Sequence, residues 1–135
     1  MLGEKLGEER GQMTGMRVLP LGPHGPRVEV SFQASGTILG QVGTDVGTYI
    51  STARPDGTMM GEGQGVVMTG EGDMANWTAT GVGKFTGKGT AINWRGALFY
   101  QTTSSRLAQL NGTAVVFEFD VDENGKTEAR IWEWK

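Results

Sequence analysis

The sequence contains no cysteine, one histidine and only four prolines among its 135 residues. Without cysteine the chain can form no disulfide, no thiolate metal site and no thiol nucleophile. The single histidine, His24, lies in a loop rich in proline and glycine, so the sequence predicts no Ser-His-Asp triad. A collagen-like chain would need far more proline and a strict three-residue glycine period, so this class is excluded as well.

Positive charge and long apolar runs are also scarce. Lysine and arginine number 12 against 15 aspartates and glutamates, which gives a formal net charge of −3. Such a chain offers no basic surface for a nucleic-acid backbone, so we expect no nucleic-acid partner. The first residues carry charge from Glu4 onward, and no later segment approaches a membrane span. We therefore expect no signal peptide, no membrane partner and a cytoplasmic location.

Glycine is the residue that the chain has in excess, with 23 in total and the densest run between positions 59 and 90. In the segment 60–68, glycines 61, 63 and 65 alternate with larger side chains. Successive side chains of a strand point to opposite faces, so one face of this strand is nearly bare. A bare face lets a strand bend sharply or lets another side chain approach closely, and a small barrel needs both.

A two-residue alternation of polar and apolar side chains predicts eight strands. They cover residues 5–19, 27–39, 44–53, 59–68, 73–85, 91–101, 113–121 and 126–135. The clearest alternation lies in 27–39, where one face carries Val28, Val30, Phe32, Ala34 and Ile38. Asp56-Gly57 and Asn124-Gly125 predict hairpin turns, because these residues tolerate positive φ. Only residues 102–112 have helical character, over one or two turns.

These features predict one domain that spans residues 1–135. The expected fold is all-β, an antiparallel eight-stranded barrel, because closure removes the exposed edges of a sheet. A two-sheet β-sandwich is the alternative architecture. At 135 residues the chain is long enough to bury a genuine core in either case.

Two glycine-containing patterns resemble ligand-binding loops but lack their decisive parts. Residues 120–125 begin like an EF-hand loop, yet the twelfth position is Ile131 instead of a glutamate, and the flanking segments are predicted strands. A plain acidic hairpin turn explains them better, so we expect no metal site. The glycine-rich segments 61–65 and 80–90 complete no phosphate-loop pattern and precede no predicted helix. We therefore expect no cofactor.

The last third of the chain carries Leu107, Leu110 and Gly112, then a predicted strand, the Asn124-Gly125 turn and a closing strand with Trp132-Glu133-Trp134. This succession resembles the C-terminal part of small bacterial proteins in the allene oxide cyclase-like barrel superfamily. The resemblance implies an eight-stranded barrel, frequent oligomers, and members that range from plant cyclases to bacterial proteins without known activity. The catalytic residues of the cyclases cannot be placed on this sequence, so the resemblance assigns no reaction.

Glu62 and Gln64 are the candidate polar residues of a site inside the barrel. If the bulky face of their strand points inward, a carboxylate and an amide enter a cavity that Trp77, Trp94 and Tyr100 also line. Such a carboxylate would have a raised pKa and could act as a general acid or base, or hold the polar end of a ligand. In the alternative interpretation, the glycines point inward beneath neighbouring aromatic rings, and Glu62 and Gln64 lie in solvent.

Three functions remain open on these grounds. The first is a binding module that takes an apolar or aromatic small molecule in or at the mouth of the barrel. The second is a cofactor-independent enzyme of the isomerase or cyclase type, in which Glu62 moves a proton. The third is a structural homo-oligomer with a filled barrel that assembles through Trp132 and Trp134. Arg10 and Gln12, on the first predicted strand, are a second candidate pair for the interior.

Overall fold

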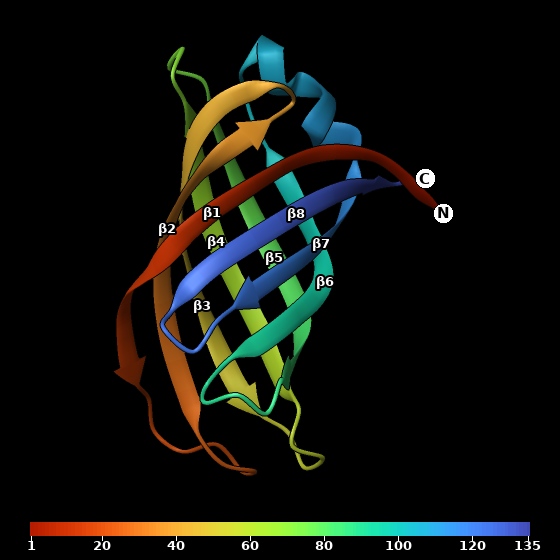
Figure 1. Cartoon of the computed structure of the whole chain (residues 1–135). Coiled ribbons are helices and arrows are strands. Elements are labelled where there is room, and N and C mark those ends of the chain that lie inside the picture. Colours follow the sequence, from red (N-terminus) through yellow and green to blue (C-terminus); the bar gives the residue numbers. More distant parts are fainter.

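A computed structural model describes all residues from 1 to 135 and shows a closed barrel of eight strands (Figure 1). Each strand pairs antiparallel with the next, and β8 pairs antiparallel with β1. This architecture confirms the predicted eight-stranded barrel and excludes the sandwich alternative. In chain order the elements are β1 (Leu2–Val18), β2 (Arg27–Ile38), β3 (Gln41–Ala53), β4 (Met59–Thr69), β5 (Met74–Phe85), β6 (Ile92–Gln101), the 3-10 helix η1 (Ser105–Gly112), β7 (Ala114–Val121) and β8 (Lys126–Trp134).

The largest differences from the predicted strand limits lie at the starts of β1 and β3. β1 begins three residues earlier than predicted because its first residues pair with the end of β8, where Leu2 lies opposite Trp134. β3 begins directly after a two-residue turn in which Leu39 and Gly40 have φ values of 48° and 76°. Leu-Gly carries no strong turn signal in a sequence, so the expected loop was longer than the observed one.

Both predicted hairpin turns are confirmed. Gly57 and Gly125 have φ values of 87° and 80°, which are conformations that favour glycine. Asp122 Oδ1 accepts hydrogen bonds from the backbone N–H groups of Asn124 and Lys126, at 2.8 and 2.9 Å. The acidic segment 120–125 therefore forms a hairpin turn in which an aspartate side chain fixes the backbone.

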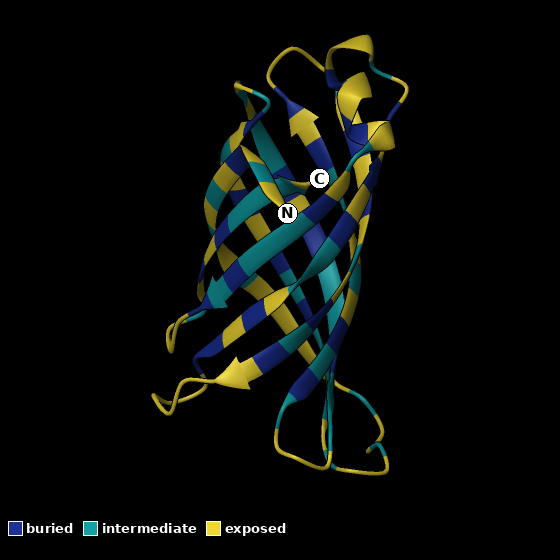
Figure 2. Cartoon of the chain, turned by 90° about the vertical axis from the view of Figure 1, so that its right-hand side faces the viewer, coloured by how far each residue is buried: buried dark blue, intermediate teal, exposed yellow.

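Burial alternates along the strands, as Figure 2 shows by the bands of dark blue and yellow. On β2 the predicted inward face is confirmed, since Phe32, Ala34 and Ile38 are buried. The helix η1 covers one end of the barrel, at the top of Figure 1, and its Leu107 and Leu110 are 0% exposed. The predicted helical segment is thus a 3-10 helix whose two leucines pack into the hydrophobic core at this end. None of the helical structure has the length and apolar character that crossing a bilayer requires.

The inward-facing glycines serve two purposes. Some form a floor for the indole rings: a Cβ atom on Gly65 would lie 2.3 Å from Trp77 Cζ2, and one on Gly61 would lie 2.6 Å from Trp94 Cζ3. Others allow strands to approach closely, since a Cβ atom on Gly36 would lie 2.0 Å from a backbone oxygen of β1. Both uses agree with the interpretation of the glycine run as a means of bending and close approach.

Candidate functional site

The interior of the barrel holds a cavity of about 100 Å³ whose walls come from all eight strands. One water needs roughly 10–15 Å³ of such space, so the cavity is large enough for a small organic molecule. Its aromatic lining consists of Phe32, Tyr49, Trp77, Trp94, Tyr100, Phe117 and Phe119. The interior is therefore a largely apolar chamber with several flat ring surfaces.

Five of these rings are in mutual contact. Phe32 lies 4.9 Å from Phe119 and 6.3 Å from both Tyr49 and Trp77, measured between ring centroids. Tyr49 stands edge-on to Trp94 at 5.6 Å. These separations lie in the range that favours aromatic pairs, so Phe32 and Tyr49 connect the two indoles in one aromatic wall.

Four residues with carboxyl groups border this chamber: Glu8 and Glu62 are exposed, whereas Glu9 from β1 and Asp45 from β3 lie on its inner face. Asp45 is 6% exposed and accepts a hydrogen bond of 2.8 Å from Trp77 Nε1, whereas Glu9 is half-buried. Both positions fall in the inward phase of their strands and are flanked two residues away by glycine. The absence of neighbouring side chains leaves room for the two carboxyl groups to approach each other.

Burial raises the pKa of Glu9 to about 9, and the adjacent Asp45 carboxyl group adds to this shift. Burial also raises the pKa of Asp45, but hydrogen bonds with Glu9 and with Trp77 act in the opposite direction. No lysine, arginine or histidine borders the cavity. Glu9 therefore keeps its proton at neutral pH, beside the buried carboxyl group of Asp45.

The other polar groups of the wall are hydrogen-bond donors. Burial raises the pKa of Tyr49 to about 12, and burial together with the charges of Asp45 and Glu9 raises the pKa of Tyr100 well above its ordinary value. Both phenols therefore stay protonated. Trp94 is 4% exposed, and its indole N–H is buried in the cavity wall without an acceptor in bonding geometry.

The structure brings the three predicted aromatic residues together. Trp77, Trp94 and Tyr100 are all buried and border the cavity. Trp77 and Tyr100 are direct neighbours across the β5–β6 pair. Trp94 lies nearer the start of β6. Their contact with a ligand remains a prediction.

Glu62 and Gln64 are exposed, which confirms the interpretation that turns the glycines of β4 inward. Gly61 faces the ring of Trp94 and Gly65 faces the ring of Trp77, so alternation points the side chains at 62 and 64 away from the barrel. Glu62 borders the cavity, but only as an exposed residue. The expectation that these two polar groups enter the chamber is therefore corrected: Glu9 and Asp45 occupy it instead.

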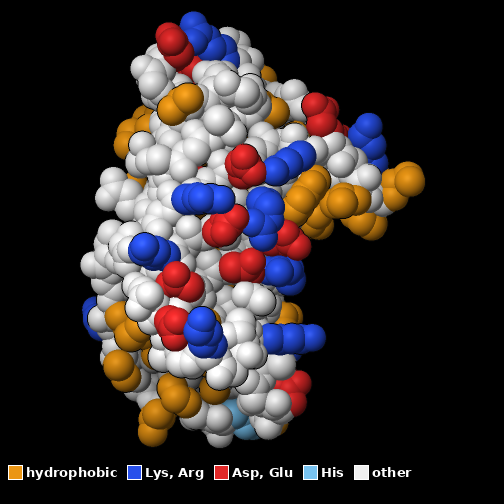
Figure 3. All heavy atoms as spheres, viewed as in Figure 1, with side chains coloured by type: hydrophobic (Ala, Val, Ile, Leu, Met, Phe, Trp, Pro, Cys, Tyr) orange, Lys and Arg blue, Asp and Glu red, His pale blue; other side chains and the backbone are white.

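The remaining candidates from the sequence lie outside the cavity. Arg10 and Gln12 are exposed, and Arg10 forms an ion pair of 3.6 Å with Glu128. Trp132 is half-buried, and Trp134 is 52% exposed near the chain termini. Figure 3 shows hydrophobic side chains gathered at this place, on the right of the view.

Sequence reasoning missed Glu9 and Asp45. Asp45 carried a usable signal, because it shares its phase with Gly43, Gly47 and the inward Tyr49. Glu9 carried none, since β1 is charged at successive positions around it and shows no apolar face. The phase of Glu9 became visible only once β1 was paired with Gly36 of β2 and Ala129 of β8.

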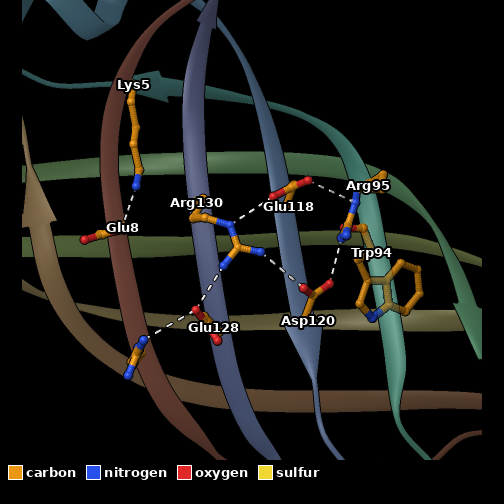
Figure 4. Close-up of polar contacts among 9 residues, drawn as sticks. Lys5, Glu8, Trp94, Arg95, Glu118, Asp120, Glu128 and Arg130 are labelled. Carbon is orange, nitrogen blue, oxygen red and sulfur yellow. Dashed lines mark hydrogen bonds and ion pairs between the residues drawn. The ribbon is translucent and has the colours of Figure 1, made fainter. Parts of the chain in front are cut away.

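Carboxylates on the outer wall are arranged differently (Figure 4). Arg130 of β8 lies 2.9 Å from Glu118, 3.3 Å from Asp120 and 3.0 Å from Glu128. Arg95 of β6 lies 2.7 Å from Asp120 as well. Figure 3 shows this mixture of blue and red side chains across the face formed by β1, β8 and β7. This ion-pair network is separate from the cavity.

No protein-family model matches the chain, and no curated protein sequence matches it. Solved structures share its fold. A protein with unknown function from Clostridium acetobutylicum superimposes with a TM-score of 0.83 at 11% identity, over 98% of each chain. A beta-barrel like protein from Acinetobacter baumannii gives a TM-score of 0.83 at 12% identity, over 100% of this chain and 96% of that one.

An enzyme from Penicillium herquei is also similar, with a TM-score of 0.67 at 16% identity, over 96% of this chain and 92% of that chain. At such identities the likeness establishes the fold alone, because one fold hosts many activities. The chain is thus a small barrel protein of the same architecture as barrels with unknown function.

Proposed function

We propose that this protein binds a small apolar or aromatic molecule inside its barrel. The observation that carries the proposal is the cavity of about 100 Å³, walled by aromatic rings and bordered by the inward carboxyl groups of Glu9 and Asp45. Ligand pockets typically combine a mainly apolar lining with a few polar groups that fix orientation. An apolar cavity of about 150 Å³ can hold benzene, and this one is smaller, so the expected ligand places no more than a single ring inside it.

In this proposal Trp77, Trp94 and Tyr100 supply contact surface, and Glu9 and Asp45 replace Glu62 and Gln64 as the polar groups. We also propose that the chain belongs to the allene oxide cyclase-like superfamily. It is supported by the eight-stranded barrel and by the resemblance of the last third of the chain.

The four tryptophans allow a test with an internal control. Toluene is titrated into ¹⁵N-labelled protein while the indole N–H signals are followed by NMR. Binding in the cavity should shift the signals of Trp77 and Trp94 and leave those of Trp132 and Trp134 unchanged, because the latter two do not border the cavity. Unchanged signals for Trp77 and Trp94 at saturating toluene would refute the proposal.

The carboxyl pair favours a second candidate, a cofactor-independent isomerase or cyclase. A protonated Glu9 offers a general acid, and the neighbouring Asp45 offers a second carboxyl group that can exchange a proton with it, within one apolar chamber. Any rearrangement of a cavity-bound substrate should then be lost in Glu9→Gln while the circular dichroism spectrum stays unchanged. Full turnover in a folded Glu9→Gln variant would exclude this role.

The third hypothesis, a barrel filled by its own side chains, is disfavoured by the cavity. Assembly into a homo-oligomer is a separate proposal, supported by the exposed apolar residues Leu2 and Trp134 at the adjoining termini. Light scattering coupled to size exclusion tests it, and a strictly monomeric mass would contradict it.

A further inference from the structure

We infer that the cavity takes a small aromatic ammonium compound, whose cationic nitrogen lies between Glu9 and Asp45 and whose ring bears an oxygen that accepts a hydrogen bond from the Trp94 indole. This inference rests on the proposed binding function and specifies the ligand of the same site.

The first step is the charge of the chamber. Asp45 is buried and accepts the Trp77 N–H at 2.8 Å, but a neutral indole cannot balance a carboxylate. No cationic side chain borders the cavity, whereas carboxylates on the outer wall share arginines. Buried charges in proteins are normally paired with an opposite charge. A cationic ligand would supply the partner that the chain does not provide for the Asp45 carboxyl group.

The groups around Glu9 support the same conclusion. Its strand neighbours are Gly36 on β2 and Ala129 on β8, neither of which is ionisable. The ionisable groups that face it are Asp45 on β3 and Tyr100 on β6. A proton on Glu9 removes one negative charge from this pair of carboxyl groups, and a bound ammonium group would replace that proton.

The second step is the aromatic wall. Phe32, Tyr49, Trp77 and Trp94 present rings to one space. Rings of this kind attract a cation through their negative faces, most strongly when water is excluded. An anionic ligand of the same size would meet both the ring faces and the carboxylate, so the chamber should reject it.

The third step is an unused donor at the other indole. The benzo edge of Trp94 rests on the glycine floor, with Cζ3 closest to Gly61, so its nitrogen lies on the opposite edge. This buried N–H faces the Tyr49 hydroxyl but forms no hydrogen bond of good geometry with it, and a poorly satisfied buried donor is costly. An ether or hydroxyl oxygen on the ligand ring would satisfy it.

Three probes of matched size test the charge preference: benzylamine, benzyl alcohol and benzoate, titrated at pH 7 by calorimetry. We expect benzylamine to bind at least about tenfold more tightly than benzyl alcohol, and benzoate to bind most weakly. Equal or tighter binding of benzyl alcohol or benzoate would overturn the inference while leaving toluene binding, and thus the proposed function, intact. A failure of toluene and of all three probes would refute the proposed function itself, and the inference with it.

Two variants locate the charge. Asp45→Asn keeps an oxygen that can accept the Trp77 N–H but removes the carboxylate, so the preference for benzylamine should disappear while benzyl alcohol binds as before. Glu29→Gln on the outer face, where Glu29 pairs with Arg17 at 3.2 Å, serves as the control and should change nothing. If Asp45→Asn does not fold, Glu9→Gln takes its place and should retain the preference, because the carboxyl group of Asp45 remains available to the ammonium group. Loss of the preference in Glu9→Gln, or its persistence in folded Asp45→Asn, would overturn the inference.

The oxygen is tested with 4-methoxybenzylamine against 4-methylbenzylamine. The methoxy compound should bind several-fold more tightly and shift the Trp94 indole proton downfield, as expected for a new hydrogen bond. Equal affinities and an unmoved Trp94 signal would overturn the assignment of the oxygen.

Discussion

The inner and outer walls of this barrel handle carboxylates in opposite ways. Outside, Glu118, Asp120 and Glu128 share Arg130 at 2.9 to 3.3 Å, in contact with solvent. Inside, Glu9 and Asp45 have no cation beside them, and a proton takes its place. The same strands form both walls, because successive side chains of a strand point alternately inward and outward. The comparison indicates that the inner pair does not stabilise the fold, which supports the proposal that these carboxyl groups bind a ligand.

The energetic balance supports this distinction. Exposed ion pairs contribute little to stability, because water and salt screen them, but they also cost little. A buried carboxylate without a cation is destabilising unless it is protonated or paired. The interior would be more stable with apolar residues at positions 9 and 45, which is typical of residues retained for binding or catalysis.

The largest expected effect concerns the pH dependence of folding. The pKa of Glu9 is raised to about 9 from an ordinary value of 4.5, so the folded state binds a proton that the unfolded state releases in this window. The stability from this group is fully present below the unfolded pKa and is lost as pH rises toward 9, by up to about 1.4 kcal/mol per pH unit. Urea unfolding of the wild type from pH 5 to pH 9 should therefore show falling stability.

The variant Glu9→Gln should remove most of this slope, because glutamine does not titrate. Glu128→Gln, on the outer wall of the same sheet, should leave the slope unchanged. Parallel curves for wild type and Glu9→Gln would show that the two walls do not differ as described.

A second, smaller effect contrasts an inner glycine with an outer one. Gly65→Ala places a Cβ atom 2.3 Å from the Trp77 ring, which must move, so we expect a loss of about 1–3 kcal/mol in the free energy of unfolding. Gly15→Ala on β1 is the matched control, because no atom lies within 4 Å of its added Cβ atom. It should be neutral or slightly stabilising. Equal destabilisation by both substitutions in urea unfolding would show that the Trp77 ring does not depend on the space that Gly65 leaves.

The smallest expected effect is on the outer wall. Arg130→Gln removes three ion pairs, yet their partial exposure should limit the loss to roughly 1 kcal/mol. The difference from the wild type should shrink further in 1 M salt, because exposed charges are screened there. A loss of several kcal/mol that persists in high salt would place the main electrostatic stabilisation of the fold outside the barrel, against the comparison drawn above.

The sequence was sufficient to predict the fold and the aromatic lining of the cavity. Strict alternation identified the inward face of β2, and turn residues such as Asp56-Gly57 fixed the hairpins. The glycine run indicated close packing, and in the structure the rings of Trp77 and Trp94 pack directly against these glycines. These properties are local, because they depend on neighbouring residues in one strand or turn.

The polar part of the site was not predictable in the same way. On β4 one face carried glycine and the other carried mixed side chains, so hydrophobicity could not decide which pointed inward. The decision depends on Trp77 and Trp94 of the next two strands, which need the space that glycine leaves. Glu9 is surrounded by charge in the sequence, and only closure of β1 against β8 turns it inward. The pairing of strands that are distant in the sequence therefore determines which polar side chains point inward, and the local sequence pattern does not.

The protonation state of Glu9 tests the account most directly. In protein labelled with ¹³C at glutamate carboxyl carbons, the Glu9 signal is assigned by its loss in Glu9→Gln and followed from pH 3 to pH 10. The account predicts that Glu9 keeps its proton through neutral pH and titrates near 9. A Glu9 signal that titrates together with the exposed glutamates would contradict the account.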